Sequence, residues 1–413
     1  MKVLQEPITD CLHDDQMCYG TIFPFQVGPN LAAVYLNIHW KGPDVVDLDN
    51  GADVILFDRW DAIDPARAVS ICRSTVEQTD DPEKTILQIR RVFSGGFVPL
   101  DAKLSDGSAH PHAGTGFGLM QVHPYNADSA GIPLANAQNV NVGMDLDMEL
   151  YQVSCDGQNF QVNATSTFVE AALLEGLSGC YLSLVQAIPD GPDLLCAITA
   201  NRPGASSCAG VCRWRRIDDC WQPIAFTPVV DFAVEEMGIE ASLIRDSDEA
   251  LLFTIRGLTA KSQHRLTLWR STDGDEWTKT LDVGPIRGQA PLTLNRTASG
   301  MIYFLGSKLS QEDRPVGMDQ LCTENRNTLC LWPVTESRDA IAGEVVIQDC
   351  ITDFGPPPSG KWWRADHAVG ASLVLEDTPY ELIAYRLIAD AEIMQAADMT
   401  PFTGAYMAQL SDL

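Results

Sequence analysis

Histidine and arginine, the side chains that most readily transfer protons and neutralise anions, are scarce in this 413-residue chain. It has 7 histidines, and 28 lysines and arginines stand against 56 acidic residues. Several of these side chains fall in segments that we expect to lead into β-strands: His110, His112, Arg287, Arg364 and His367. A histidine in such a place can act as a general acid or base, and a nearby arginine can stabilise a developing negative charge.

Carboxyl groups and aromatic rings lie in the same or similar segments. Asp366 directly precedes His367, and Glu236 and Glu240 precede another apolar run. Glycoside hydrolysis requires two carboxyls, one as the acid and one as the nucleophile or base. Further candidates for substrate binding are a histidine, a glutamine and two tryptophans that could stack on a sugar ring: His110, Gln289, Trp362 and Trp363.

A metal site is the alternative use of the two neighbouring histidines. His110 and His112 could both ligate a metal from a loop, but no clear carboxylate partner lies nearby in the sequence. We therefore predict no metal site and no cofactor.

A degenerate repeat of roughly sixty residues organises most of the chain. Short β-rich runs separated by Gly, Asp, Asn and Pro turns dominate it, and this pattern indicates an all-β fold. One aromatic residue recurs in the repeat: Tyr151, Trp214, Trp269, Trp332 and Tyr406. Each repeat predicts four strands, with the aromatic residue in the third. Predicted first strands begin near Leu119, Leu182, Leu243, Leu292 and Leu373.

Four-stranded repeats of this kind form the blades of a β-propeller. We predict a single domain over residues 1–413 with six blades, five or seven being the alternative counts. Residues 110–413 are interpreted as five blades, and a seventh blade within 93–145 is the main rival. The chain ends soon after a third strand. Residues 1–12 are therefore expected to supply the missing fourth strand and to close the ring.

The remaining blade is the most divergent. We assign it to residues 31–92, with its second strand at 54–57 and its third at 69–72. In a propeller the first strands surround the axis, so their entry ends line one mouth of the channel. The candidate residues should therefore meet at that mouth, with His112 and His367 in one pocket.

Two turns carry a family resemblance. Residues 271–277 read Ser-Thr-Asp-Gly-Asp-Glu-Trp, and residues 154–160 repeat the Ser-x-Asp-Gly pattern followed by an aromatic residue. The first resembles a compressed Asp-box of the sialidase-like, BNR-repeat propellers, which are carbohydrate-active proteins. In that family the Asp-box lies at the blade periphery, so the resemblance implies a structural role for Asp273 and Asp156. Sialidases also carry an early Arg-Ile-Pro motif, whereas residues 21–24 here read Thr-Ile-Phe-Pro.

Three functions stay open. The first is a glycoside hydrolase that uses Asp366, Glu236 or Glu240. The second is a polysaccharide lyase in which a histidine is the base and Arg287 or Arg364 neutralises the substrate carboxylate. The third is a non-catalytic scaffold that binds protein or glycan across the propeller face.

The net charge of −28 limits the classes of partner. So acidic a surface repels phosphate backbones and anionic lipids, which argues against nucleic-acid and membrane binding and leaves an oligo- or polysaccharide as the expected partner. Residues 1–7 have no apolar stretch typical of a signal peptide. The chain is expected to be cytoplasmic if this N-terminus is native, and secreted if a leader has been removed.

Overall fold

The computed structural model shows an almost entirely β structure. It describes residues 2–7, 17–40, 51–81, 83–128, 147–168, 178–182, 185–201, 207–232, 236–259, 264–286, 292–308, 326–355, 363–389 and 404–411. Helical structure within these ranges is confined to the 3-10 turn η1 (Pro65–Arg67) and the short helix α3 (Cys350–Phe354). The described helices include none long and apolar enough to cross a membrane.

Three sheets come mainly from the N-terminal half of the chain. In the first, the strand order is β2 (Met17–Gly28), β3 (Leu31–Trp40), β4 (Gly51–Phe57) and β5 (Val69–Arg73). In the second, it is β7 (Lys84–Val98), β8 (Thr115–Asp128), β9 (Asp147–Cys155) and β10 (Phe160–Phe168), and β6 (Thr75–Gln78) and β12 (Val185–Gln186) also pair with β7. In the third, β11 (Ser178–Leu182) and β13 (Ile188–Asp190) pair with β14 (Asp193–Asn201), followed by β15 (Ser207–Ile217) and β16 (Cys220–Phe232).

Three more sheets follow, each with four strands. The fourth is β17 (Glu236–Arg245), β18 (Leu251–Thr259), β19 (His264–Ser271) and β20 (Thr278–Ile286). The fifth is β21 (Thr293–Arg296), β22 (Ile302–Lys308), β23 (Thr328–Pro333) and β24 (Val345–Asp349). The sixth is β25 (Trp363–Leu375), β26 (Thr378–Ala389), β27 (Gly404–Ser411) and β1 (Lys2–Pro7).

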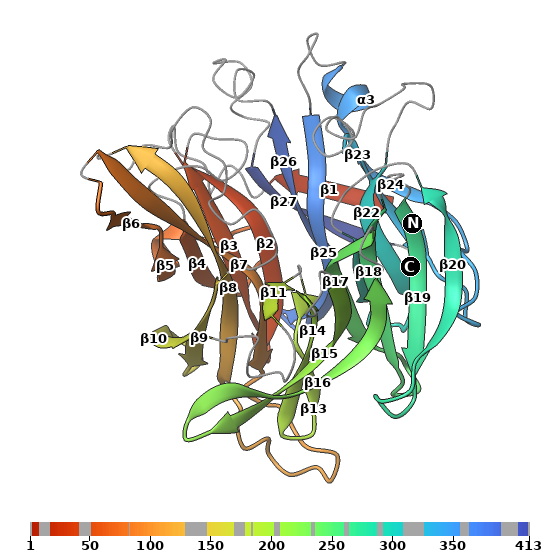
Figure 1. Ribbon diagram of the computed structural model, residues 1–413. Helices are drawn as coiled ribbons and strands as arrows, with labels where there is room; N and C mark the ends of the chain where they lie inside the picture. The colour runs from red at the N-terminus through yellow and green to blue at the C-terminus, as the bar shows by residue number, and fades with distance from the viewer. Residues whose placement is uncertain are drawn as a thin grey trace.

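The sheets are arranged around a common centre, with β17 and β25 near the middle of the view (Figure 1). Hydrogen bonds tie the first strands of neighbouring sheets together. Thr293 on β21 donates through Oγ1 to the carbonyl of Ala368 on β25 at 2.7 Å. The N–H of Val374 on β25 donates to Oε1 of Gln26 on β2 at 2.8 Å. These contacts place β21, β25 and β2 side by side.

The N-terminal strand completes the last sheet. β1 pairs antiparallel with β27, from Lys2 opposite Ser411 to Pro7 opposite Tyr406. The predicted pairing of the N-terminal residues with the strand that carries Tyr406 is confirmed. Pairing covers what would otherwise be an open edge of β27.

The recurring aromatic residues all lie in third strands, as predicted. They pack between neighbouring sheets as well as within them. Trp214 on β15 lies 4.8 Å, centroid to centroid, from Phe117 on β8 of the preceding sheet. Trp332 on β23 shares a buried cluster with Leu252 on β18 of the sheet before it. These contacts fill the spaces between the sheets with apolar volume.

The strand assignments of the first two repeats were wrong. The strands near 54–57 and 69–72 are the third and fourth of their sheet, because β2 precedes residue 31 and is its first strand. Leu119 lies in a second strand, β8, and the first strand of that sheet is β7. The continuous apolar run of β3 is buried on both faces, so it gave no alternating signal that would mark the start of the repeat.

Register in the sixth sheet depends on one tight turn. Leu375 and Thr378 are paired, and Glu376 and Asp377 between them have φ values of 49° and 58°. Two consecutive positive φ values are those of a type I′ turn, which matches the twist of a two-residue hairpin. Along the same ladder of paired residues, Asp366 lies opposite Arg386.

Candidate functional site

Asp366 on β25 is a fully buried carboxylate held by two arginines. Arg386, opposite it on β26, donates from Nε to Oδ1 at 2.7 Å, and Arg326 donates from Nη1 to Oδ2 at 2.7 Å. Burial raises the pKa of Asp366, but the positive charges of Arg386, His367 and Arg326 outweigh it and hold this pKa well below its usual range. Asp366 therefore carries a negative charge throughout the neutral pH range.

Further arginines surround this pair. Arg326 forms an isolated β-bridge with Arg364, and Arg256 on β18 donates to the carboxylate of Glu240 on β17. Burial lowers the pKa of Arg326; Asp366 raises it, and the nearby charges of Arg256 and Arg364 lower it again. The four arginines and two carboxylates of this region, which we call the arginine cluster, are all buried: Arg256, Arg326, Arg364, Arg386, Glu240 and Asp366.

Among the described residues, the arginine cluster gathers four guanidinium groups and two carboxylates in the interior of a chain whose net charge is −28. Buried charges are stable only where opposite charges and hydrogen bonds offset the loss of water. Nε of Arg326 is a buried donor without a hydrogen-bond partner within the described residues. A guanidinium N–H of this kind can donate a hydrogen bond to an anionic group.

The structure brings three of the predicted site residues together. The first residues of β25 include Arg364, Asp366 and His367, and all three side chains are buried. Glu236 begins β17, the strand that also carries Glu240; its side chain lies outside the described part, as does that of Trp363. The other three predicted substrate contacts fall outside the described residues altogether: Arg287, Gln289 and Trp362.

His110 and His112 do not join this group, so the expectation of one pocket shared by His112 and His367 was wrong. Both lie in the connection from β7 to β8, which leaves the exit end of a first strand rather than the entry end. Nε2 of His110 lies 2.9 Å from the carbonyl oxygen of Gly191, in the turn after β13. The misassignment of β8 as a first strand caused the error.

His112 packs against an aromatic ring at that other end. Its ring centroid lies 5.5 Å from that of Trp221, in an edge-to-face arrangement. Burial lowers the pKa of His112, and the charges of Arg216 and His110 lower it further. A neutral ring packed on tryptophan has the character of a structural residue.

Sequence reasoning missed three members of the arginine cluster: Arg256, Arg326 and Arg386. Two of them had a visible signal. Arg256 follows the apolar second-strand run 251–255, and Arg386 follows the equivalent run 382–385. A charged residue that ends a buried run in two repeats indicates a shared internal position. Arg326 comes from a segment before β23 with no such pattern.

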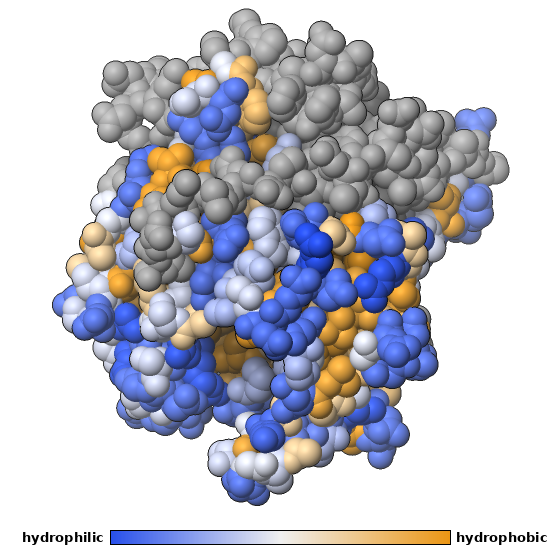
Figure 2. All heavy atoms as spheres, turned by 180° about the vertical axis from the view of Figure 1, so that it is seen from behind, coloured by the Kyte–Doolittle hydropathy of each residue, from blue (hydrophilic) through white to orange (hydrophobic). Residues whose placement is uncertain are grey.

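No metal centre is evident in the part of the chain that the structure describes, where no three His, Cys, Asp or Glu side chains gather in a way that could hold an ion. On the face seen in Figure 2, the described surface is mostly hydrophilic, and apolar residues show in patches, most clearly on the right of the view.

The turn at Asp273 has the hydrogen bonding of a rigid loop closure. Its Oδ1 accepts from the N–H groups of Asp275 and Glu276, both at 2.9 Å, and from the hydroxyl of Ser271 at 3.0 Å. Indole Nε1 of Trp277 donates to the carbonyl of Gly274 at 3.2 Å. The turn joins β19 to β20, the third and fourth strands of the fourth sheet. It therefore lies at the end of the sheet where the first strand finishes, whereas the arginine cluster lies at the end where the first strands begin.

The comparisons with known proteins show the fold. No family model matches the chain, and no curated protein matches its sequence. A solved structure of a protein of unknown function from Dyadobacter fermentans is similar, with a TM-score of 0.57 at 11% sequence identity. The match covers 98% of this chain and 98% of that protein. Trypanosoma rangeli sialidase in complex with sialic acid has a TM-score of 0.60 at 8% identity. That match covers 100% of this chain and 59% of the sialidase.

The fold is a β-propeller. The intramolecular trans-sialidase from Ruminococcus gnavus, with a TM-score of 0.54 at 10% identity, matches over 95% of this chain and 94% of its own. At such low identity the likeness concerns the propeller architecture. The arginine cluster lies at the entry ends of first strands in this propeller, and the Asp273 turn lies at the opposite end.

Proposed function

We propose that this protein is a carbohydrate-active, glycosidase-like enzyme that acts on an anionic glycan at the entry ends of the first strands. The observation that carries the proposal is the arginine cluster, in which four arginines of the described residues are buried together at one end of the propeller of a strongly acidic chain. Planar guanidinium groups bind carboxylates with two parallel hydrogen bonds, which suits recognition of an acidic sugar.

We further propose six blades, closed by β1. Six sheets succeed one another along the chain, five of them with four strands in line, and β1 supplies the outer strand of the last. A ring closed in this way fixes β17 and β25 relative to each other. The catalytic geometry then depends on contacts made by residues at the two ends of the sequence.

The roles that we assign follow from charge and position. Asp366 stays ionised and orients Arg326 and Arg386, so it is a positioning residue rather than the general acid. Glu240, beside Arg256, is the carboxylate available as nucleophile or base, and His367 is the group that transfers a proton. Glu236 remains a second candidate for the catalytic carboxyl, and the substrate contacts that we propose from the sequence are Arg287, Gln289, Trp362, Trp363 and Arg364.

Elimination by a polysaccharide lyase is the second candidate. One observation favours it: Asp366 and Glu240 are each ion-paired with arginine, so neither is a free acid for hydrolysis. A lyase needs a base and a cation that stabilises the enolate, and His367 beside Arg364 supplies both types of group.

The decisive experiment incubates the protein with a panel of acidic and neutral glycans while recording reducing ends and the absorbance of unsaturated uronates. Hydrolysis yields reducing ends alone, and elimination yields both signals. Turnover is expected only with acidic glycans. Turnover of neutral glycans at equal rates would contradict the role of the arginine cluster, and binding without turnover would indicate a scaffold.

The matched variants are Arg326→Lys and Arg265→Lys. Arg326→Lys keeps the charge but removes the planar fork, so kcat/KM for the acidic substrate should fall by about 10- to 100-fold, the worth of a charge-assisted hydrogen bond. Arg265 forms an exposed ion pair with Asp282 on the periphery, and its replacement should leave kcat/KM unchanged.

A further inference from the structure

Two cysteines face each other inside the third sheet. Cys196 on β14 and Cys212 on β15 are directly opposite in the antiparallel ladder of these two strands. Within the strands that the structure describes, no other two cysteines have this relation. Residues directly opposite each other project from the same face of a sheet, so the two thiols are neighbours.

The separation of opposite residues suits a disulfide bond. Their Cα atoms lie about 4.5 or 5.5 Å apart, according to the hydrogen-bonding class of the pair. A disulfide joins residues whose Cα atoms are about 4.4–6.8 Å apart, so both classes fall within its range. Opposite Cβ atoms are about 4.5–5.5 Å apart, against about 3.5–4.5 Å in a disulfide, so a closer approach of about 1 Å is sufficient.

Both thiols are shielded from water. Cys196 is 0% exposed and Cys212 is 1% exposed. They lie on the face that packs against the second sheet, because Trp214, two residues after Cys212 on the same face, contacts Phe117 on β8. Sγ of Cys196 donates to the carbonyl of Ala197 at 3.6 Å, which is a weak hydrogen bond. A disulfide in this place would therefore replace weakly bonded thiols by an apolar group and leave no strong donor without a partner.

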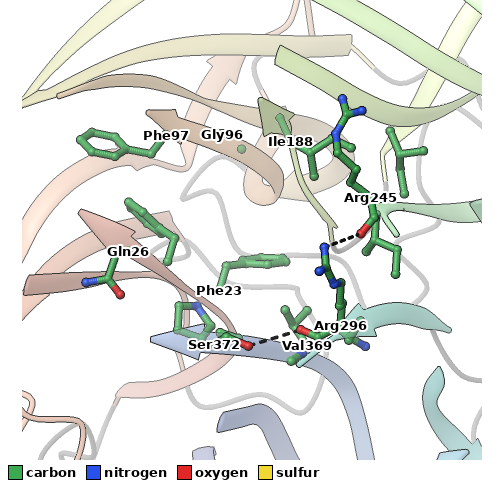
Figure 3. A pocket seen from close by; sticks show the side chains of 18 of the residues that line it. Phe23, Gln26, Gly96, Phe97, Ile188, Arg245, Arg296, Val369 and Ser372 are labelled. Atoms are coloured by element: carbon green, nitrogen blue, oxygen red, sulfur yellow. Dashed lines mark hydrogen bonds between the residues drawn. The ribbon is translucent and has the colours of Figure 1, made fainter. Parts of the chain in front are cut away.

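The hollow along the propeller axis does not reach the pair. Its volume is about 570 Å³, and Ile188 on β13 lies on its wall (Figure 3). β13 pairs with β14, and Ile188 lies opposite Leu195, the residue before Cys196. Neither Cys196 nor Cys212 lines the hollow. Reagents dissolved in water therefore reach the two sulfurs only when the hairpin of β14 and β15 opens.

We propose that Cys196 and Cys212 are a dithiol–disulfide couple that closes when the chain folds in the presence of a disulfide oxidant. One cysteine attacks the oxidant as a thiolate, forms a mixed disulfide and releases a first thiolate. The other cysteine attacks the mixed disulfide at the protein sulfur, so the S–S bond forms between the two Sγ atoms and a second thiolate leaves. The two thiol protons pass to the two released thiolates, and the oxidant gains two electrons.

The closed bond has two consequences for the folded protein. It links residues 196 and 212, which are already neighbours in the sheet, so it restricts the unfolded chain and should raise the melting temperature by several degrees. Burial also protects the bond. Dithiothreitol should therefore reduce it at least about 10-fold more slowly in the folded protein than in urea.

Refolding of the full-length chain tests the couple without any enzymatic assay. The protein is reduced and unfolded in urea, freed of reductant, and diluted into reduced or oxidised glutathione. Remaining thiols are blocked with N-ethylmaleimide in denaturant, and thiols that appear on later reduction are labelled with iodoacetamide and located by tandem mass spectrometry. After oxidative refolding, the iodoacetamide label should be on both Cys196 and Cys212.

Three outcomes would overturn the proposal. The first is N-ethylmaleimide on both residues, or on one of them, in oxidatively refolded protein that melts cooperatively. The second is a disulfide that forms only in protein without a cooperative melting transition. The third is equal rates of reduction by dithiothreitol in folded and unfolded protein.

Three variants identify the bond through the melting temperature. Cys196→Ala and Cys212→Ala each remove one sulfur, so each variant should melt at the same temperature after refolding in either form of glutathione. Cys208→Ala is the matched control and should keep the difference, because Cys208 lies on the same face of β15 but opposite Ala200. Each variant is compared with itself, so any loss of packing cancels. If one cysteine variant fails to fold, the other variant and the label positions in the wild type still decide the matter.

Discussion

Glu240 and His367 occupy matching positions in the first strands of two different sheets. Each is a buried non-glycine residue with a positive φ, 58° and 52°, at a register shift of its strand pair. β21 lies between the two strands and hydrogen-bonds to both, through Ser242 and Ala368. The two residues are therefore at the same level around the axis. Bulges and left-handed backbone at equivalent places are typical of sites where side chains must be re-aimed.

The first prediction concerns His367. His367→Asn should preserve folding, because asparagine tolerates a left-handed backbone, but should lower turnover by about 10²- to 10⁴-fold, the range for a general acid or base. Turnover of the substrate found in the glycan panel and the melting temperature are measured together. Glu376→Asn, at an exposed turn residue with φ of 49°, is the control and should leave both unchanged. A fully active His367→Asn would remove His367 from the mechanism.

The second prediction is a pH dependence of stability. Removal of the Asp366 charge leaves two buried arginines without their partner, so Asp366→Asn should lower the free energy of unfolding by about 3–5 kcal/mol at pH 7. The folded-state pKa of Asp366 is depressed. Its contribution is therefore complete above the unfolded value of about 4 and is lost as pH falls toward the folded pKa.

Urea unfolding of wild type and Asp366→Asn from pH 7 to pH 3 measures this directly. The difference between the two proteins should be constant from pH 7 to about pH 5 and should narrow below about pH 4. A difference that grows as pH falls would mean that Asp366 is protonated in the folded protein.

The third prediction separates His112 from the reaction. His112→Ala should lower the melting temperature, because it removes an edge-to-face contact with Trp221, while kcat/KM stays within about twofold of wild type. Reduced turnover with an unchanged melting temperature would instead assign His112 a catalytic role at the exit end of the propeller.

A structural feature could be predicted from the sequence only where a short stretch of neighbouring residues carries the pattern for it. The aromatic anchors predict their third strands because each sits in a short apolar run next to turn residues. Asp366 and His367 could be identified as candidates for the same reason. The ion pair between Asp366 and Arg386 could not be predicted from the sequence, because it depends on the register between β25 and β26, which the Glu376–Asp377 turn sets.

The placement of His112 failed for a related reason. Residues 99–114 have the glycines and polar residues of a connection, and nothing local tells a connection before a first strand from one after it. Only the pairing of β7 with β8 shows that this segment leaves a first strand. An error of one strand in the repeat moves a loop to the opposite mouth of a propeller.

The fourth prediction tests the structural role of Asp273. Its carboxylate accepts from two backbone N–H groups and one hydroxyl in the turn, and these bonds lower its pKa. Asp273→Ala should therefore lower the melting temperature and leave kcat/KM unchanged. Asp248→Ala is a matched control, since this exposed aspartate pairs with Arg270 on the surface, where ion pairs contribute little. Loss of turnover in a folded Asp273→Ala would contradict a purely structural role.

The last prediction concerns the closing strand. Deletion of residues 1–12 removes β1, which exposes the edge of β27, and it should lower the melting temperature by several degrees or more.

A circular permutant is the control for this deletion. Because Lys2 is paired with Ser411, the two ends of the chain lie close together. A short glycine linker can therefore join them, with new ends opened in the exposed turn between Asp218 and Asp219. This permutant keeps every strand pairing of the sixth sheet, so it should melt at or above the temperature of the wild type. Differential scanning calorimetry of the three proteins checks both expectations. If the deletion melts like wild type, the pairing of β1 with β27 does not stabilise the propeller, and if the permutant melts as low as the deletion, the loss stems from disturbed ends rather than from the missing strand.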